Sequence, residues 1–186
     1  MKVNAVKTEQ EIKEKLHGSS DFKSRSVQFF GTDITICYIA DITDNMLLND
    51  TLINPITEAD EMQFEDVITE LKESVLSNQE VSEVDNLQTA VDKLLAGNTL
   101  ILVDGANSIL ACDMEKITTR AVQEPPTSVV IKGPREGFTE SLKYNLALIR
   151  KRVRTDDLVV QTLEVGKLTK TQVCVTYFNS VAKKKV

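Results

Sequence analysis

The strongest folding signal lies between residues 85 and 112, where a helical pattern leads into two β-rich runs. Asp85 and Gln88 are typical of a helix start, and apolar side chains then recur at helical spacing up to Leu95. Gly97 follows, where a left-handed residue commonly ends a helix. Two apolar runs around a short turn come next: residues 99–103, 104–107 and 108–112. This order predicts helix, strand, turn and strand, and therefore a mixed α/β fold.

The residues before this segment continue the mixture of helices and strands. Thr8 and Glu11 form a capping-box pattern, which predicts a short first helix. Two β-rich runs then flank Gly31-Thr32-Asp33, at residues 27–30 and 34–40. Because glycine favours a tight reversal, these runs predict a β-hairpin.

An acidic region with helical character follows this hairpin. Asp44 is a suitable N-cap for a short helix over residues 45–50, and Asn54-Pro55 is expected to end it. Apolar residues recur at i, i+3, i+4, i+7 and i+11 from Phe64, which predicts a second helix over residues 62–76.

Charge and proline content divide the chain into two parts. Residues 1–118 carry 9 Lys/Arg against 22 Asp/Glu, a net −13, whereas residues 119–186 carry 13 against 6, a net +7. Glu124-Pro125-Pro126 lies close to this change of sign and favours extended backbone. We therefore predict an acidic α/β subdomain over 1–118 and a basic one over 119–186. The second reads β-α-β-β, with elements at 128–132, 139–152, 158–165 and 171–178, and it ends in lysines without a closing helix, as if truncated.

Composition restricts the classes of function. Hydrophobic residues make up 41% of the 186 residues, but aromatic residues only 5%, with no Trp, so the core is expected to be aliphatic and stacking platforms for nucleic-acid bases are few. No run is long enough to span a bilayer and no secretory signal is evident, so the chain as given is expected to be soluble and intracellular. Cys37, Cys112 and Cys174 are expected to be buried free thiols.

The residue types that catalysis or metal binding would need are scattered. His17, the one histidine, lies in a polar stretch and is expected to be solvated at a helix end. One histidine and three distant cysteines do not form a zinc motif. The acidic residues between Asp41 and Asp50 lack the spacing of a calcium loop. We therefore expect no enzyme activity, no cofactor and no metal.

The most informative segment runs from Val129 to Arg154. A predicted strand leads into a glycine- and proline-containing turn and then a helix, a geometry that can hold an anion, although neither the P-loop nor the dinucleotide fingerprint is present. Asn145 is expected on the apolar face of this helix, in line with Phe138, and to hydrogen-bond backbone groups of the turn together with Arg135. The helix ends in a cluster of cations expected to form an exposed basic patch: Arg150, Lys151, Arg152 and Arg154.

This segment resembles the signature of the GerA family, the A subunits of bacterial spore germinant receptors and their paralogues. The resemblance is sharp from Arg120 to about Phe178 and general before that. The residues that carry it are Glu124-Pro125, the block Gly133, Pro134, Arg135, Glu136, Gly137 and Phe138, then Glu140, Leu142, Asn145, Leu148-Ile149-Arg150, Arg152, Thr169-Lys170-Thr171 and Tyr177.

The resemblance implies a soluble N-terminal domain that precedes transmembrane helices in the whole protein. The receptor would lie in the spore inner membrane with B and C subunits, with this domain on the cytosolic side, and would respond to nutrients by triggering ion release. One hypothesis is a signalling and assembly domain whose two subdomains contact partner subunits or copies of themselves. The alternative is a domain that binds a small-molecule germinant between its two halves. Which nutrient acts, and whether the chain is a receptor subunit or a channel-associated paralogue, stay open.

Overall fold

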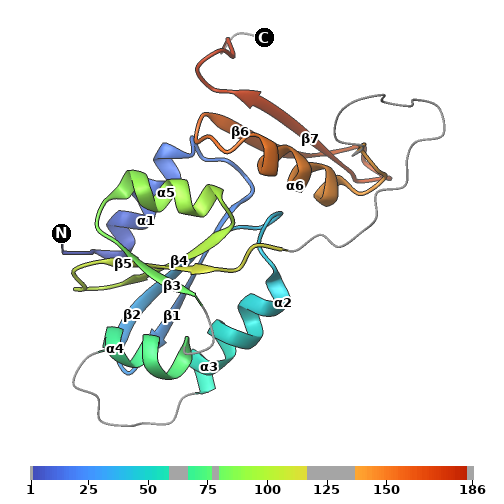
Figure 1. The fold of residues 1–186 in the computed structure, drawn as a ribbon. Helices are drawn as coiled ribbons and strands as arrows, with labels where there is room; N and C mark the ends of the chain where they lie inside the picture. Colours follow the sequence, from blue (N-terminus) through green and yellow to red (C-terminus); the bar gives the residue numbers. More distant parts are fainter. Residues whose placement is uncertain (1, 59–66, 77–79, 117–136, 184–186) are drawn as a thin grey trace, which may run out of the picture.

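The computed structural model describes residues 2–58, 67–76, 80–116 and 137–183 of the chain. Two groups of strands are present: a main sheet of β1 to β5 and a C-terminal hairpin of β6 and β7 (Figure 1). The elements, with two π-helical segments η1 and η2, are α1 (Ala5–Lys15), β1 (Phe22–Phe29), β2 (Thr32–Ile39), α2 (Asn45–Leu48), η1 (Asn49–Ile53), α3 (Asn54–Glu58), α4 (Val67–Glu70), η2 (Leu71–Val75), β3 (Val81–Val84), α5 (Leu87–Leu95), β4 (Asn98–Val103), β5 (Ile109–Asp113), α6 (Leu142–Arg152), β6 (Leu158–Val165) and β7 (Thr171–Phe178). The predicted α/β class is confirmed.

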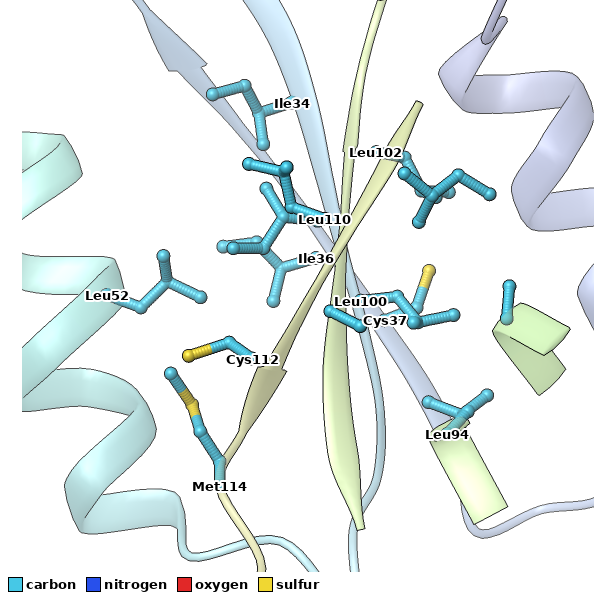
Figure 2. Packing of buried hydrophobic residues seen from close by; sticks show 14 of the residues in the cluster. Ile34, Ile36, Cys37, Leu52, Leu94, Leu100, Leu102, Leu110, Cys112 and Met114 are labelled. Carbon is cyan, nitrogen blue, oxygen red and sulfur yellow. The ribbon is translucent and has the colours of Figure 1, made fainter. Parts of the chain in front are cut away.

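The main sheet is antiparallel throughout, with strand order β1-β2-β4-β5-β3. Helices cover both of its faces, and the buried side chains in Figure 2 show how one strand serves two layers. Ile36 points towards the face on which Leu52 of η1 lies, whereas its neighbour Cys37 points towards Leu94 of α5. Successive side chains of a strand alternate between faces, so a central strand such as β2 must be apolar on both sides. The core is aliphatic, as predicted.

The predicted hairpin at residues 27–40 is confirmed as β1 and β2, joined by Phe30 and Gly31. Both joining residues have positive φ, 49° and 77°, which is the backbone of the turn that matches strand twist. β1 begins at Phe22, earlier than predicted. Its start was missed because residues 23–26, which follow the buried Phe22, are polar and exposed and show no apolar alternation.

Two predicted helix caps, Thr8 and Asp85, are wrong, because an asparagine is the N-cap residue of each helix. α1 begins after Asn4, whose side chain accepts a hydrogen bond from the Lys7 N–H, so Thr8 lies buried inside the helix. α5 begins after Asn86, which accepts from the Thr89 N–H, and not at Asp85. The predicted Asp44 cap is confirmed, with bonds from the Met46 and Leu47 N–H groups.

The predicted helix break at Asn54-Pro55 is wrong, since α2, η1 and α3 follow one another without interruption. A π-helical turn lies directly before the proline, and its wider spacing lets the Asn54 N–H reach the carbonyl of Asn49. Pro55, which has no N–H, is thus accommodated inside the continuous helix by the π-helical turn before it.

The C-terminal hairpin has the bounds expected from its alternating pattern, while α6 begins at Leu142, later than predicted, after its cap Ser141. The strand β3 was not predicted. The expected strand at 128–132, the start of the helix expected at 62–76 and the boundary at 118–119 lie outside the described residues. None of the helices in the described ranges has the length and apolar run that crossing a bilayer requires.

Candidate functional site

Arg150 is the largest polar side chain in the buried interior. It lies on the last turns of α6 and is 0% exposed. The expectation that it belongs to an exposed basic patch is therefore wrong. A guanidinium removed from water needs an opposite charge and hydrogen-bond acceptors around it, and those partners define the site.

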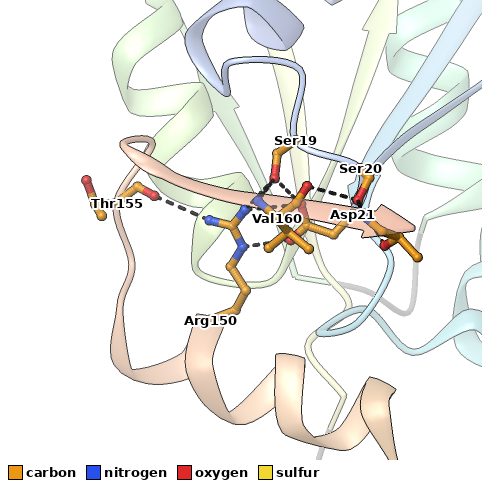
Figure 3. Close-up of polar contacts among 7 residues, drawn as sticks. Ser19, Ser20, Asp21, Arg150, Thr155 and Val160 are labelled. Carbon is orange, nitrogen blue, oxygen red and sulfur yellow. Dashed lines mark hydrogen bonds and ion pairs between the residues drawn. The ribbon is translucent and has the colours of Figure 1, made fainter. Parts of the chain in front are cut away.

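The side chains that bind Arg150 lie between α1 and β1, and one backbone carbonyl follows α6 (Figure 3). Arg150 Nε donates to Asp21 Oδ2 at 2.7 Å and its Nη2 to Asp21 Oδ1 at 3.1 Å, so the ion pair is bidentate. Nη2 also donates to Ser19 Oγ at 3.0 Å, and Nη1 to the Thr155 carbonyl at 3.4 Å. The Asp21 side chain is only 1% exposed, so both charges are compensated inside the protein.

The same short segment also binds the edge of β6. The Ser20 N–H donates to the Val160 carbonyl at 2.8 Å, and the Val160 N–H donates to Ser19 Oγ at 2.8 Å. Ser20 Oγ accepts from the Thr162 N–H at 3.1 Å. The segment thus takes the place of a strand beside β6. We call Ser19, Ser20, Asp21, Arg150 and Val160 the Arg150 junction (Figure 3).

Local geometry explains why these serines reach the hairpin. His17 and Gly18 both adopt positive φ, 53° and 67°, after the end of α1, and they turn the chain towards β1. Ser19 then donates from its hydroxyl to Asp21 Oδ1 at 2.6 Å while accepting from Arg150 and Val160. His17 itself is exposed at the helix end, as predicted.

Asp41 is a second carboxylate close to the junction. Burial, and then the negative charge of Asp21, raise its pKa above the ordinary value, while Lys143, Arg150 and Lys23 act in the opposite direction. Of the acidic residues between Asp41 and Asp50, Asp44 caps a helix and Asp50 is exposed, whereas Asp41 is half-buried. In the part of the chain that the structure describes, no three or more His, Cys, Asp or Glu side chains lie together in a group that could hold a metal ion.

The cysteines are poor nucleophiles in this fold. Cys37 and Cys112 are buried as predicted, and burial raises both thiol pKa values, that of Cys112 to about 11. Cys174, on β7, is half-buried, so the expectation of full burial is wrong for it. Burial raises its pKa as well. Thiols with raised pKa values stay protonated at neutral pH and react slowly.

The remaining cations of the predicted patch differ in environment. Lys151 is half-buried, and its Nζ lies 3.1 Å from Glu115 Oε1 and donates to the Lys116 carbonyl at 3.0 Å. It therefore joins α6 to the residues that follow β5. Arg152 and Arg154 are exposed. That Arg152 and Arg154 form a basic interaction patch stays a prediction.

Part of the turn motif precedes α6 within the described residues. The Asn145 side chain accepts from the Thr139 N–H and donates to the Thr139 carbonyl, both at 2.8 Å, so its predicted backbone hydrogen bonds are present. Phe138 lies before the helix and is 70% exposed, so its predicted place on the helix face is wrong. Gly137 is half-buried. The rest of the motif lies outside the described residues: Gly133, Pro134, Arg135 and Glu136.

Sequence reasoning selected Arg150 and Asn145 but missed the partners of Arg150. Asp21 is 129 positions away, and nothing around it forms a motif. An acidic residue directly before a β-strand is too common to single out.

Comparison with known proteins gives one consistent result. The family model described as Bacillus/Clostridium GerA spore germination protein matches residues 10–186. Spore germination protein KA of Bacillus subtilis is 30% identical over 179 residues, which is 95% of this chain and 33% of that protein. Spore germination protein B1 of the same organism is 31% identical over 147 residues, covering 79% of this chain and 30% of that protein. The chain thus spans about a third of the length of these relatives.

A solved structure is similar over almost the whole chain. It is the N-terminal domain of the A subunit of the Bacillus megaterium spore germinant receptor GerK3, with a TM-score of 0.77 and 26% identity. The match covers 99% of this chain and 68% of that one. Sequence, family model and fold agree, and the chain belongs to the GerA family of spore germination proteins.

Proposed function

We propose that this chain is the N-terminal signalling and assembly part of a membrane-embedded spore germinant receptor A subunit. In this proposal it passes the effect of a nutrient to the rest of the receptor and performs no catalytic step. The observation that carries the proposal is the Arg150 junction. In it a buried ion pair joins the signature arginine of α6 to Asp21, directly before β1, and the neighbouring Ser19 and Ser20 bond β6 of the C-terminal hairpin.

The receptor context comes from the relatives. Their names include spore germination proteins and the A subunit of a germinant receptor. We infer from this similarity a place at the spore inner membrane, with this part on the cytosolic side and the B and C subunits as partners. The alternative is a channel-associated paralogue of these subunits.

Mechanical coupling is what the junction geometry supports best. α6 is bonded to Asp21 through Arg150 and to Glu115 through Lys151. β6 is bonded to Ser19 and Ser20. A force applied to α6 or to the hairpin is therefore transmitted to the chain at the start of β1 and at the end of β5. A buried, bidentate ion pair allows only a narrow range of geometry. A displacement of α6 should therefore also move the segment that contains Asp21.

The direct test is nutrient-triggered germination of spores that carry variants of the full-length protein. Arg150→Met should lower the germination rate at least tenfold, whereas Arg25→Met, at an exposed arginine on β1, should leave it near normal. Receptor amount in the spore membrane is measured in parallel by immunoblot. Normal germination at a normal level of the Arg150→Met protein would refute the proposal.

Variants with smaller structural effects keep the test informative if Arg150→Met does not accumulate. Ser19→Ala removes one acceptor of Arg150 and of the Val160 N–H, and Glu115→Gln removes the charge that pairs with Lys151. Each should slow germination while the protein accumulates.

Titration of the 186-residue chain with nutrients by calorimetry tests the germinant-binding alternative, and saturable heat would replace our proposal with that one.

A further inference from the structure

The turn between β4 and β5 contains a dipeptide that is prone to rearrangement of its backbone. Asp104-Gly105 is the one Asp-Gly pair in the sequence, and Asn-Gly does not occur. An aspartate before glycine cyclises readily, because glycine has no side chain to hinder the approach of its nitrogen to the carboxyl group. A Cβ atom built on Gly105 would meet no described atom within 4 Å, so the surroundings do not crowd this residue either.

The residues before α1 are bonded to the backbone of this turn. The Val3 N–H donates to the Ala106 carbonyl at 2.7 Å, and the Gly105 N–H donates to the Val3 carbonyl at 2.9 Å. The Val3 side chain is buried and belongs to the hydrophobic core. Both bonds of the turn are therefore held by a residue that is itself fixed by packing.

The carboxylate of Asp104 is held by the same segment. Its Oδ1 accepts from the Ala5 N–H at 3.2 Å, at the start of α1. This N–H is one of the donors that a helix leaves without a partner in its first turn, and a negative charge is favourable there. The two groups that would react with each other, the Asp104 carboxylate and the Gly105 N–H, are thus both bonded to residues 3–5.

We propose that Asp104-Gly105 is a site of spontaneous isomerisation that residues 3–5 keep inert. In the reaction the Gly105 nitrogen bonds to Cγ of Asp104, and the amide proton leaves with the carboxyl hydroxyl as water, which closes a succinimide ring. Water then adds at the main-chain carbonyl carbon of Asp104 and breaks its bond to the Gly105 nitrogen. The product is isoaspartate, in which the main chain runs through Cγ. The reaction releases and consumes one water and needs no oxidant or reductant.

The two hydrogen bonds oppose this reaction for separate reasons. Ring closure requires the Gly105 nitrogen to lose its proton and turn towards Cγ, whereas the bond to the Val3 carbonyl holds the proton and the peptide plane in place. The carboxylate must also leave the Ala5 N–H before it can meet the nitrogen. The reaction is therefore confined to molecules in which residues 3–5 have separated from the turn, which is a local opening of the structure.

Isomerisation would alter the connection between two neighbouring strands of the main sheet. Isoaspartate adds a carbon atom to the main chain between β4 and β5, and it moves the carboxylate away from the start of α1. The turn would then no longer match residues 3–5, and a transient opening would become permanent. The inference concerns the integrity of the molecule over time and does not depend on the proposed receptor role.

The reaction is measured by incubating the 186-residue chain at neutral pH and mapping its peptides by mass spectrometry. Electron-transfer fragmentation distinguishes isoaspartate from aspartate. The reference is a synthetic peptide of residues 102–108, in which residues 3–5 are absent. The protein should isomerise at least tenfold more slowly than the peptide, because only the opened molecules react. Equal rates in protein and peptide would overturn the inference.

A matched pair of valine substitutions tests the role of residues 3–5. Val3→Ala removes two buried methyl groups, so opening becomes easier and the isomerisation rate should rise about tenfold. Val6→Ala makes the same change at a side chain that is 72% exposed, and the rate should stay that of the parent protein. Equal rates in the two variants would refute the protective role of this segment.

Hydrogen exchange of the Gly105 amide gives an independent measurement of the same opening. Exchange should be faster in Val3→Ala than in the parent protein and unchanged in Val6→Ala, since the bond to the Val3 carbonyl protects this amide. Circular dichroism establishes that both variants keep the fold. A Gly105 amide that exchanges at the rate of the free peptide in the parent protein would show that residues 3–5 do not hold the turn.

Asp104→Glu tests the chemistry of the site. Glutamate has an additional methylene, so the ring would have to be larger and would form far more slowly, while a carboxylate remains near the start of α1. No isomerised product should appear at this position. Product at the rate of the parent protein would show that succinimide formation is not its source, and the assignment of the site would be wrong.

Discussion

At the scale of single residues, the main feature is a charge that the protein has removed from water. Burying a guanidinium and a carboxylate costs free energy, which their bidentate contact and the hydroxyl of Ser19 offset. Removing one partner leaves the other charge buried and uncompensated. Such a pair is therefore sensitive to single substitutions even where its net contribution to stability is small.

Arg150→Met should lower the free energy of unfolding by about 3–5 kcal/mol, because it leaves Asp21 charged and buried. Urea denaturation followed by circular dichroism measures the change. Arg25→Met, at an exposed position of β1, should cost less than about 0.5 kcal/mol. Equal effects of the two substitutions would contradict the structural role of the ion pair.

Asp41 should make stability depend on pH. Its pKa is raised in the folded state, chiefly by burial, so the folded protein binds this proton more tightly than the unfolded chain does. Protonated Asp41 therefore favours the folded state. Its contribution to the free energy of unfolding is complete below the ordinary carboxyl pKa and is lost as pH rises through the pKa of Asp41 in the folded protein. Asp41→Asn should therefore increase stability at pH 7, relative to the parent protein, and this gain should vanish near pH 3.5. A gain of equal size at both pH values would exclude this explanation.

At the scale of elements, apolar alternation was a good guide wherever it was strong. β4 to β7 were predicted within about a residue, since each carries apolar side chains at strand spacing. β3 was missed because Val81-Ser82-Glu83-Val84 is too short and polar to stand out. The continuous helix through Pro55 was missed because a π-helical turn cannot be foreseen from composition. The Arg150 junction was missed for a different reason, because its partners are distant in sequence and only the fold brings them together.

Gly97 controls how α5 is connected to β4. Its φ is +102°, and a Cβ atom there would lie 2.9 Å from both the Cβ and the Cγ of Glu115, the partner of Lys151. Gly97→Ala should therefore lower the free energy of unfolding by more than about 1 kcal/mol, from backbone strain together with the clash.

Gly105→Ala is the matched control for Gly97→Ala. Its φ is +80°, but nothing lies within 4 Å of the added Cβ, so only the backbone strain applies. Thermal or urea denaturation of both variants separates the two contributions. A Gly105→Ala cost as large as that of Gly97→Ala would show that Glu115 moves aside freely.

At the scale of the whole molecule, specific bonds between described residues join the segment before β1 to the C-terminal hairpin. A two-stranded hairpin is only marginally stable alone in water. β6 gains a second bonded edge from Ser19 and Ser20, and this makes the stability of the hairpin dependent on the N-terminal part.

Hydrogen exchange measures this dependence. Ser19→Ala removes the acceptor of the Val160 N–H, so exchange at Val160 should become at least tenfold faster, while the amides of β4 and β5 should be little affected. Ser24→Ala removes an exposed hydroxyl of β1 and should leave the Val160 amide protected. Unchanged exchange at Val160 in Ser19→Ala would show that the hairpin is held by other contacts.

The long separation between Asp21 and Arg150 also has a consequence for biosynthesis. Asp21 leaves the ribosome well before Arg150 does, and the main sheet can form as soon as β5 has emerged. In a nascent chain at that stage, Asp21 lacks Arg150, and Ser19 and Ser20 lack their hydrogen-bond partners on β6. Docking of α6 and the hairpin then follows formation of the main sheet, and a product that is stalled or truncated before Arg150 should present Asp21 to water.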